Sequence, residues 1–222
     1  MMYHSSAPLE GAQVCAPAVP PSPPAPAVSP AKRALDLTCA LGALLFFAPL
    51  LLVIAGLIRL DSKGPALFRQ KRGGLNNEAF VIFKFRTMRV QEDGGDIKHC
   101  ARGDARVTRL GAFLRRTSLD ELPQLLNVVR GDMSLVGPRP HALAHDELYG
   151  ALLPEYVERT VAKPGLTGLA QISGHRGDIS DLDAMRKRVG CDLEYIRTWS
   201  FAQDVKLILA TASRVLFDRA AY

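Results

Sequence analysis

Residues 37–58 read LTCALGALLFFAPLLLVIAGLI, an apolar run of 22 residues without a charged side chain. As an α-helix rising about 1.5 Å per residue, the run would be roughly 33 Å long, close to the hydrocarbon thickness of a bilayer. A helix in a soluble core rarely extends so far without a polar face, and a cleaved signal peptide has a shorter apolar region. The run therefore predicts a membrane helix over residues 31–60.

A proline near the middle of this run leaves two topologies open. Pro49 must interrupt the hydrogen-bond pattern of a helix. Basic residues flank the run on both sides, Lys32 and Arg33 before it and Arg59 and Lys63 after it, so the positive-inside bias favours neither orientation. A helix that enters the bilayer, bends and returns to the same face fits these features, and a kinked helix that spans the bilayer fits them equally.

The segment before the run, residues 1–30, holds eight of the chain's 15 prolines and one charged residue, Glu10. Such a composition cannot form a packed core and favours extended conformations. We expect a disordered Pro/Ala-rich tail, and a ligand for a proline-recognising partner is the alternative.

The chain as a whole is basic, with a net charge of +6 and a pI near 9.3. This charge favours anionic partners, namely phosphorylated substrates, an acidic membrane surface or nucleic acid. Nucleic acid is the least favoured, because aromatic residues make up only 7% of the chain and no nucleic-acid-binding motif is present. The spacing of the four cysteines predicts neither a zinc site nor disulfides and favours a reducing, cytosolic environment.

Residues 61–222 are expected to form a mainly helical α+β domain. Two β-rich runs around Asn76-Asn77 predict a short β-hairpin, because asparagine tolerates the left-handed backbone of a turn. Polar residues 91–106 predict a loop. Helical patterns occupy four further segments, which are 109–131 with a break near Thr117-Ser118, 142–160, 181–198 and 201–217. The apolar stripe of the last segment suits either the core or an amphipathic helix on the bilayer surface.

The sequence TSLDELPQ at residues 117–124 is the first candidate for chemistry. Ser118 and Glu121 have the spacing of a capping box, in which they only start a helix and Asp120 is a favourable first-turn anion. In the catalytic interpretation, the helix start offers backbone N–H groups to a phosphate and keeps Asp120 ionised as a carboxylate nucleophile. Adjacent helical residues point in different directions, so the two carboxylates would have different roles.

Basic residues accompany this motif along the chain: Lys84, Arg86, Arg115, Arg116, Arg139 and Arg176. Phosphoryl transfer depends mainly on neutralising charge on the transferred group, and the guanidinium fork suits phosphate oxygens. Any one of these residues taken alone is also typical of a solvated surface charge. The segment GPRP at 137–140 is more distinctive, because Pro138 and Pro140 restrict the backbone on both sides of Arg139.

The histidines show no metal-ligand pattern. His141 and His145 are four residues apart, but the glutamate spacing of zinc proteases does not accompany them, so zinc is not expected. His175 is next to Arg176 and suits either a place beside the substrate or a packing role.

Taken together, four segments closely resemble the bacterial sugar transferases, the monotopic polyprenyl-phosphate phosphoglycosyl transferases that start exopolysaccharide and glycan assembly. They are residues 32–74, FKFRTM at 83–88, RLGAFLRRTSLDELPQLLNVVRGDMSLVGPRP at 109–140 and KPGLTGLAQISG at 163–174. The resemblance covers essentially residues 31–222. The part from His175 onwards is similar to the subgroup that transfers glucose 1-phosphate to undecaprenyl phosphate.

The resemblance implies a reaction in two steps. Asp120 would attack the β-phosphate of a UDP-sugar and release UMP, and undecaprenyl phosphate would then take the sugar phosphate from the carboxylate. Glu121 would assist by proton handling or by positioning Mg²⁺, the expected cofactor, with both carboxylates as its ligands. The phosphate-binding arginine of the family corresponds to Arg115, and its uridine-associated segment corresponds to Pro138-Arg139-Pro140. Arg176 corresponds to a later arginine motif.

The resemblance also implies a helix that re-enters the membrane with its break at Pro49, and a catalytic domain over 61–222 on the cytosolic face of the bacterial inner membrane. The sequence leaves open whether the protein forms a homo-oligomer. Leu169 and His175 depart from residues common in relatives, so the donor is the least constrained feature: glucose is expected, and galactose or another UDP-sugar is the alternative. A membrane-anchored basic adaptor is the non-enzymatic alternative, which accounts for the charge and the anchor but not for TSLDELPQ and GPRP.

Overall fold

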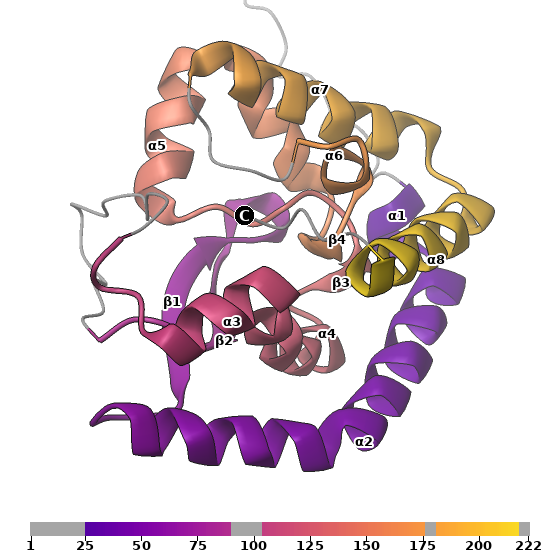
Figure 1. Cartoon of the computed structure of the whole chain (residues 1–222). Helices are drawn as coiled ribbons and strands as arrows, with labels where there is room; N and C mark the ends of the chain where they lie inside the picture. Colours follow the sequence, from indigo (N-terminus) through magenta and orange to yellow (C-terminus); the bar gives the residue numbers. More distant parts are fainter. Residues whose placement is uncertain (1–24, 90–103, 176–180, 218–222) are drawn as a thin grey trace, which may run out of the picture.

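A computed structural model describes residues 25–89, 104–175 and 181–217 of the chain. Within these residues the protein is mainly helical, with two small sheets of two strands each (Figure 1). The predicted α+β class, mainly helical with a short hairpin, is confirmed.

The apolar run lies in α2 (Pro30–Asp61), which follows the short helix α1 (Ala25–Val28). Ser29 begins α2, because its side-chain oxygen accepts a hydrogen bond from the backbone N–H of Lys32 at 3.3 Å. Helical structure therefore starts before residue 30, where the predicted tail ends. The rest of that tail, residues 1–24, lies outside the described part of the chain.

Helix α2 is bent sharply into two arms, and the rest of the protein lies in the angle between them (Figure 1). Pro49 lies inside this helix, where a proline removes a backbone hydrogen bond and clashes with the preceding turn. By length and composition α2 is able to cross a membrane, and only 11% of its most apolar window is buried. Leu45 and Phe46, in the middle of the helix, are 81% and 78% exposed. A large apolar surface of α2 is therefore not covered by the described protein.

The first arm of α2 is anchored by buried charges. The ammonium of Lys32 donates hydrogen bonds to Asp204 at 2.7 Å and to the Tyr195 hydroxyl at 3.1 Å. One turn later, Asp36 accepts a hydrogen bond from the backbone N–H of Leu135 at 2.9 Å. Because these groups are buried and paired, they fix the arm in one orientation on the body.

The second arm of α2 returns to the same body. Ile54 and Ile58 pack in one buried cluster with Phe85 and Leu114. The guanidinium of Arg86 donates hydrogen bonds to the carbonyl of Ile58, in the last turn of α2, and to that of Ser62, which follows the helix. Both arms of α2 thus pack on the rest of the protein, whereas the middle of the helix does not. This arrangement favours the re-entrant topology over a helix that spans the bilayer.

The hairpin pairs β1 (Leu67–Gly73) with β2 (Ala79–Phe85) in antiparallel register, so that Leu67 lies opposite Phe85. The 3-10 turn η1 (Leu75–Asn77) connects the strands, and Asn76 and Asn77 have φ values of 52° and 63°. The predicted turn at these asparagines is confirmed, because their backbone adopts the left-handed conformation that asparagine tolerates.

The segment that contains TSLDELPQ forms α3 (Arg109–Thr117), the 3-10 helix η2 (Leu119–Gln124) and α4 (Leu125–Arg130). The predicted break near Thr117-Ser118 is confirmed, since Ser118 has φ 58° and ends α3. Asn127 of α4 accepts a hydrogen bond from the backbone N–H of Phe83 at 3.0 Å and donates one to the carbonyl of Val81 at 2.7 Å. This amide extends the edge of β2, and it thereby fixes η2 beside the hairpin.

The second sheet consists of two short strands with helices between them in the sequence. Strand β3 (Ser134–Val136) runs parallel to β4 (Gly165–Thr167). Between these strands lie α5 (Leu143–Leu152) and the 3-10 helix η3 (Pro154–Val161). The predicted helix around 142–160 is confirmed over α5, but it is interrupted at Leu153 and continues as a 3-10 helix, because Pro154 disfavours the helical conformation at the residue before it.

After β4 follow α6 (Leu169–Ile172), α7 (Leu182–Thr198) and α8 (Phe201–Phe217). The helices predicted over 181–198 and 201–217 are confirmed. On α8 the buried contacts are made by Asp204 and Leu207, whereas Leu209 of the predicted apolar stripe is 65% exposed. Most of the loop predicted over 91–106 lies outside the described residues.

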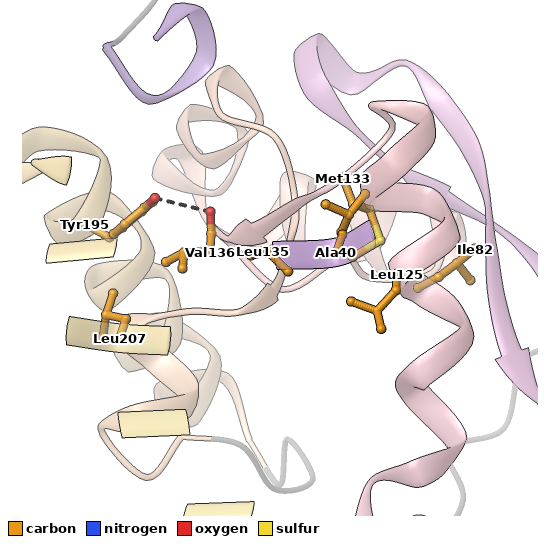
Figure 2. Close-up of a cluster of buried hydrophobic side chains, with 9 residues drawn as sticks. Ala40, Ile82, Leu125, Met133, Leu135, Val136, Tyr195 and Leu207 are labelled. Carbon is orange, nitrogen blue, oxygen red and sulfur yellow. Dashed lines mark hydrogen bonds between the residues drawn. The ribbon is translucent and has the colours of Figure 1, made fainter. Parts of the chain in front are cut away.

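The largest buried cluster joins helices and strands from both halves of the sequence (Figure 2). Its members come from α2, β2, α4, β3, α7 and α8, or from the turn before β3: Ala40, Ile82, Leu125, Val128, Met133, Leu135, Val136, Tyr195 and Leu207. Figure 2 also shows the hydroxyl of Tyr195 beside the carbonyl of Val136, at 3.2 Å. The core thus holds β3 rigidly, and with it the GPRP segment that follows.

Candidate active site

Three of the residues predicted for the site meet in one cluster. The carboxylate of Glu121 accepts hydrogen bonds from Lys84 Nζ at 2.9 Å and from Arg139 Nη2 at 2.6 Å, both on Oε1. Nη1 of Arg139 lies 3.4 Å from the second oxygen, Oε2. Strand β2, helix η2 and the segment after β3 each contribute one of these side chains, so the cluster depends on the tertiary fold.

The two cations determine the charge of Glu121. Burial alone would raise its pKa, but Arg139 and Lys84 more than offset burial and hold the pKa of Glu121 well below its usual range. A carboxylate in such a state is permanently ionised near neutral pH. It is therefore suited to fixing cations and unsuited to exchanging protons.

Asp120, the neighbouring carboxylate, is in the opposite situation. No described residue donates a hydrogen bond to its side chain. Burial and the negative charge of Glu121 raise the pKa of Asp120 to about 6, although Lys84, Arg115 and Arg139 act in the other direction. At pH 7 the carboxylate is still mostly ionised, and none of the residues in the described ranges donates to its oxygens. This is the state that a carboxylate nucleophile requires.

The backbone of this motif differs from the predicted capping box. Ser118 adopts the left-handed conformation, its side chain makes no capping hydrogen bond to η2, and the Glu121 side chain points to Lys84 and Arg139 instead. A helix does start after Ser118, as predicted, but its first six residues form the 3-10 helix η2. The left-handed residue turns the chain sharply, which places Asp120 and Glu121 beside β2.

The remaining predicted site residues are distributed differently. Arg115, in the last turn of α3, is half-buried and close enough for its charge to lower the pKa of Asp120. Pro138 and Pro140 are buried on either side of Arg139. The guanidinium of Arg86 does not join the cluster, because it donates to the carbonyls of Ser62 at 2.6 Å and Lys63 at 2.7 Å. Arg176 lies outside the described residues.

Two cations that the sequence did not single out also surround Arg139. Burial and the neighbouring charge of Arg139 lower the pKa of Arg72, on β1, to about 10. The same two causes lower the pKa of Arg188, on α7, to about 10. Nothing in the local sequence indicated these residues, because their position depends on strand pairing and on the packing of α7. The region around Arg139 thus carries an excess of positive charge, which suits an anion with more than one negative charge.

The histidines and cysteines give no metal site among the described residues, where no cluster of three or more metal-binding side chains occurs. His141 is buried and its Nδ1 lies 2.7 Å from the hydroxyl of Tyr156. Burial and nearby arginines hold the pKa of His141 well below its usual range, so the ring is neutral. Cys39 and Cys191, the cysteines within the described ranges, are free.

Comparison with known proteins gives the family. The family model described as bacterial sugar transferase matches residues 27–218. The chain is 55% identical over 199 residues to a UDP-glucose:undecaprenyl-phosphate glucose-1-phosphate transferase of Caulobacter vibrioides, covering 90% of this chain and 74% of that protein. It is 49% identical to the protein of the same name from Xanthomonas campestris pv. campestris, over 86% of this chain but only 40% of the relative's length.

A third relative, the exopolysaccharide production protein PSS of Rhizobium leguminosarum bv. phaseoli, is 48% identical over 81% of this chain and 92% of its own length. The residues that the family model matches include the segments that build the Lys84, Glu121 and Arg139 cluster. The chain belongs to the bacterial sugar transferase family.

Proposed function

We propose that this enzyme transfers glucose 1-phosphate from UDP-glucose to undecaprenyl phosphate, with release of UMP, and so initiates exopolysaccharide synthesis. The observation that carries the proposal is the contrast within the carboxylate pair: among the described residues none donates a hydrogen bond to Asp120, whereas Glu121 is bound to Lys84 and Arg139. A carboxylate without donors beside fixed cations suits attack on a phosphate. The names of the Caulobacter and Rhizobium relatives support the donor, the acceptor and the pathway class.

In the first step, an oxygen of Asp120 attacks the β-phosphorus of UDP-glucose. The bond between this phosphorus and the oxygen that bridges the two phosphates breaks, and the bridging oxygen leaves with UMP. The product on the enzyme is an aspartyl phosphate that carries the sugar. Lys84 and Arg139 neutralise charge on the diphosphate, and Arg115 adds positive charge beside Asp120.

In the second step, a phosphate oxygen of undecaprenyl phosphate attacks the same phosphorus. The bond to Asp120 breaks, so the carboxylate is restored and the sugar leaves on a lipid diphosphate. Neither step requires a proton from the enzyme when the attacking groups are ionised. Glu121 therefore acts by holding Lys84 and Arg139 in place, since its low pKa makes proton transfer unfavourable.

The membrane arrangement follows from α2. A lipid phosphate is presented at a bilayer surface, whereas a nucleotide sugar is soluble, so the site must lie where the two meet. Both arms of α2 contact one body while its middle is exposed and apolar, which suits insertion into one leaflet and return. We place the catalytic part on the cytosolic face of the inner membrane, where UDP-sugars are made.

The site offers two carboxylates that could hold a magnesium ion. Magnesium usually keeps several waters and binds one or two carboxylates together with substrate phosphates. Asp120 and Glu121 are the carboxylates that would hold it, and Asp120 is the one whose oxygens have no other partner among the described residues. When bound, the ion would neutralise negative charge on the diphosphate.

The test is UMP release by detergent-purified protein supplied with undecaprenyl phosphate, magnesium and a panel of UDP-sugars. Release with UDP-glucose, and with no other donor, supports the proposal. Release only with UDP-galactose or another donor would show that the donor sugar is not glucose, while the proposed reaction would stand. A folded protein that releases UMP from none of them would favour the membrane-anchored adaptor.

A further inference from the structure

The backbone of residues 138–140 is held through its carbonyl groups. The first carbonyl accepts a hydrogen bond from the backbone N–H of Gly165 at 2.8 Å, and the third accepts one from Nη1 of Arg72 at 3.3 Å. The middle carbonyl, that of Arg139, accepts a hydrogen bond from Nη2 of Arg159 at 2.5 Å. Two of these three residues are prolines without an N–H group, so donors from other elements must fix the segment.

Arg159 is itself held firmly. Its Nε and Nη2 donate to one carboxylate oxygen of Asp192, at 3.0 Å and 2.8 Å. Its third nitrogen, Nη1, lies 3.2 Å from the hydroxyl of Tyr156 and 3.0 Å from Nδ1 of His141. The side chains of Arg159 and Asp192 are only 5% and 1% exposed. Every nitrogen of this buried guanidinium therefore has a partner, and Nη2 is shared between Asp192 and the Arg139 carbonyl.

We infer that Arg159, held in place by Asp192, is a positioning residue that aligns Arg139 for binding the donor diphosphate. The inference rests on the proposed function. Arg159 lies in η3 and Asp192 in α7, so the pair transmits the position of α7 to the backbone from which the Arg139 side chain extends. The same alignment brings the Arg139 guanidinium to Glu121.

A role in stability alone accounts for these contacts less well. A buried ion pair contributes little net stability, because the loss of hydration offsets the attraction between the charges. The planar guanidinium is needed here because it reaches a carboxylate and a carbonyl at once, in two directions. A lysine in its place would keep the charge but not this geometry.

The test compares Arg159→Lys with wild type, and repeats the comparison in an Arg139→Ala background. Acting alone, Arg159→Lys should lower kcat/KM for UMP release by about 10-fold to 100-fold, as expected when a binding group is displaced by roughly 1 Å. In the Arg139→Ala background the same substitution should change kcat/KM by less than about twofold, because its effect passes through Arg139. Arg197→Lys is the matched control, since Arg197 also joins α7 to η3 through Glu158 but is exposed.

Asp192→Asn provides a second variant with nearly the same shape, and the same dependence on Arg139 is expected. Equal losses with and without Arg139 would overturn the inference, as would unchanged kcat/KM in folded Arg159→Lys protein. Failure of both variants to fold would assign the pair a structural role and would also overturn it. If wild type releases no UMP from any donor, the proposed function fails instead, which separates the two results.

Discussion

Nη2 of Arg139 lies 2.6 Å from Oε1 of Glu121, so two residues 18 positions apart in the sequence form one ionic unit beside Asp120. Lys84 donates to the same oxygen and completes the unit. The adjacent carboxylates thus have different surroundings, because one binds cations and the other is left without donors among the described residues, and the proposed function gives them separate roles.

Glu121→Gln should separate these roles. Removing the charge leaves Lys84 and Arg139 without a counter-ion and displaces them, so kcat/KM should fall by about 100-fold or more. Because the charge of Glu121 raises the pKa of Asp120, the acid limb of the pH profile of kcat/KM should move to lower pH, below the value of about 6 for wild type. Glu78→Gln, in the exposed hairpin turn, is the control. An acid limb that stays at the same pH would contradict the coupling.

Asp120→Asn should stabilise the protein above neutral pH. The pKa of Asp120 in the folded protein, about 6, lies above its ordinary value of 3.8. The folded state therefore binds this proton more tightly than the unfolded state, a stabilising contribution that is present below pH 4 and lost as pH rises through 6. At pH 8 the neutral amide should raise the unfolding temperature by about 2–4 °C for each kcal/mol recovered.

The same substitution should bring no gain in unfolding temperature at pH 4, where the wild-type carboxyl is already protonated. Asp183→Asn, at an exposed position on α7, serves as the control at both values. A lower unfolding temperature for Asp120→Asn at pH 8 would mean that the carboxylate is stabilised by its surroundings.

Lys32→Met should weaken the docking of the first arm of α2. It removes one partner of a buried ion pair and leaves Asp204 without its cation, which costs about 3–5 kcal/mol. Thermal unfolding in detergent measures the loss. The control is Arg59→Met near the other end of the same helix, where the side chain is exposed. Equal effects of the two substitutions would show that the buried pair does not anchor the arm.

Lys84 and Arg86 should give opposite results when replaced. Lys84→Met is expected to lower kcat/KM by about 100-fold with little change in unfolding temperature. Arg86→Met should lower the unfolding temperature, because the carbonyls of Ser62 and Lys63, which follow α2, lose their donor, while kcat/KM of the folded protein stays near wild type. Loss of kcat/KM in stable Arg86→Met protein would place this residue in the site after all.

The site residues could be predicted only where short motifs carry them. TSLDELPQ and GPRP indicated Asp120, Glu121 and Arg139 from residue type and local spacing alone. Lys84 and Arg86 were grouped with the motif only because both are basic residues near the end of the predicted hairpin. Strand β2, however, ends at Phe85, and Arg86 turns toward α2.

Contacts between segments that are distant in the chain could not be predicted from the sequence. Arg159 and Asp192 are 33 residues apart and meet only because η3 packs on α7. Lys32 was interpreted as a flanking charge of a membrane helix, whereas it is buried against Asp204, 172 residues later. The bend in α2 could be predicted from the sequence, because a proline inside a helix kinks it whether the helix lies in a membrane or in a soluble core.

The most direct test of the account is UMP release from UDP-glucose by Asp120→Asn compared with wild type, with undecaprenyl phosphate and magnesium supplied to both. The account predicts release by wild type and none above background by the variant, whose unfolding temperature is at least as high as that of wild type at pH 8. Release by folded Asp120→Asn at a rate near wild type would contradict it, because the reaction would then proceed without the proposed nucleophile.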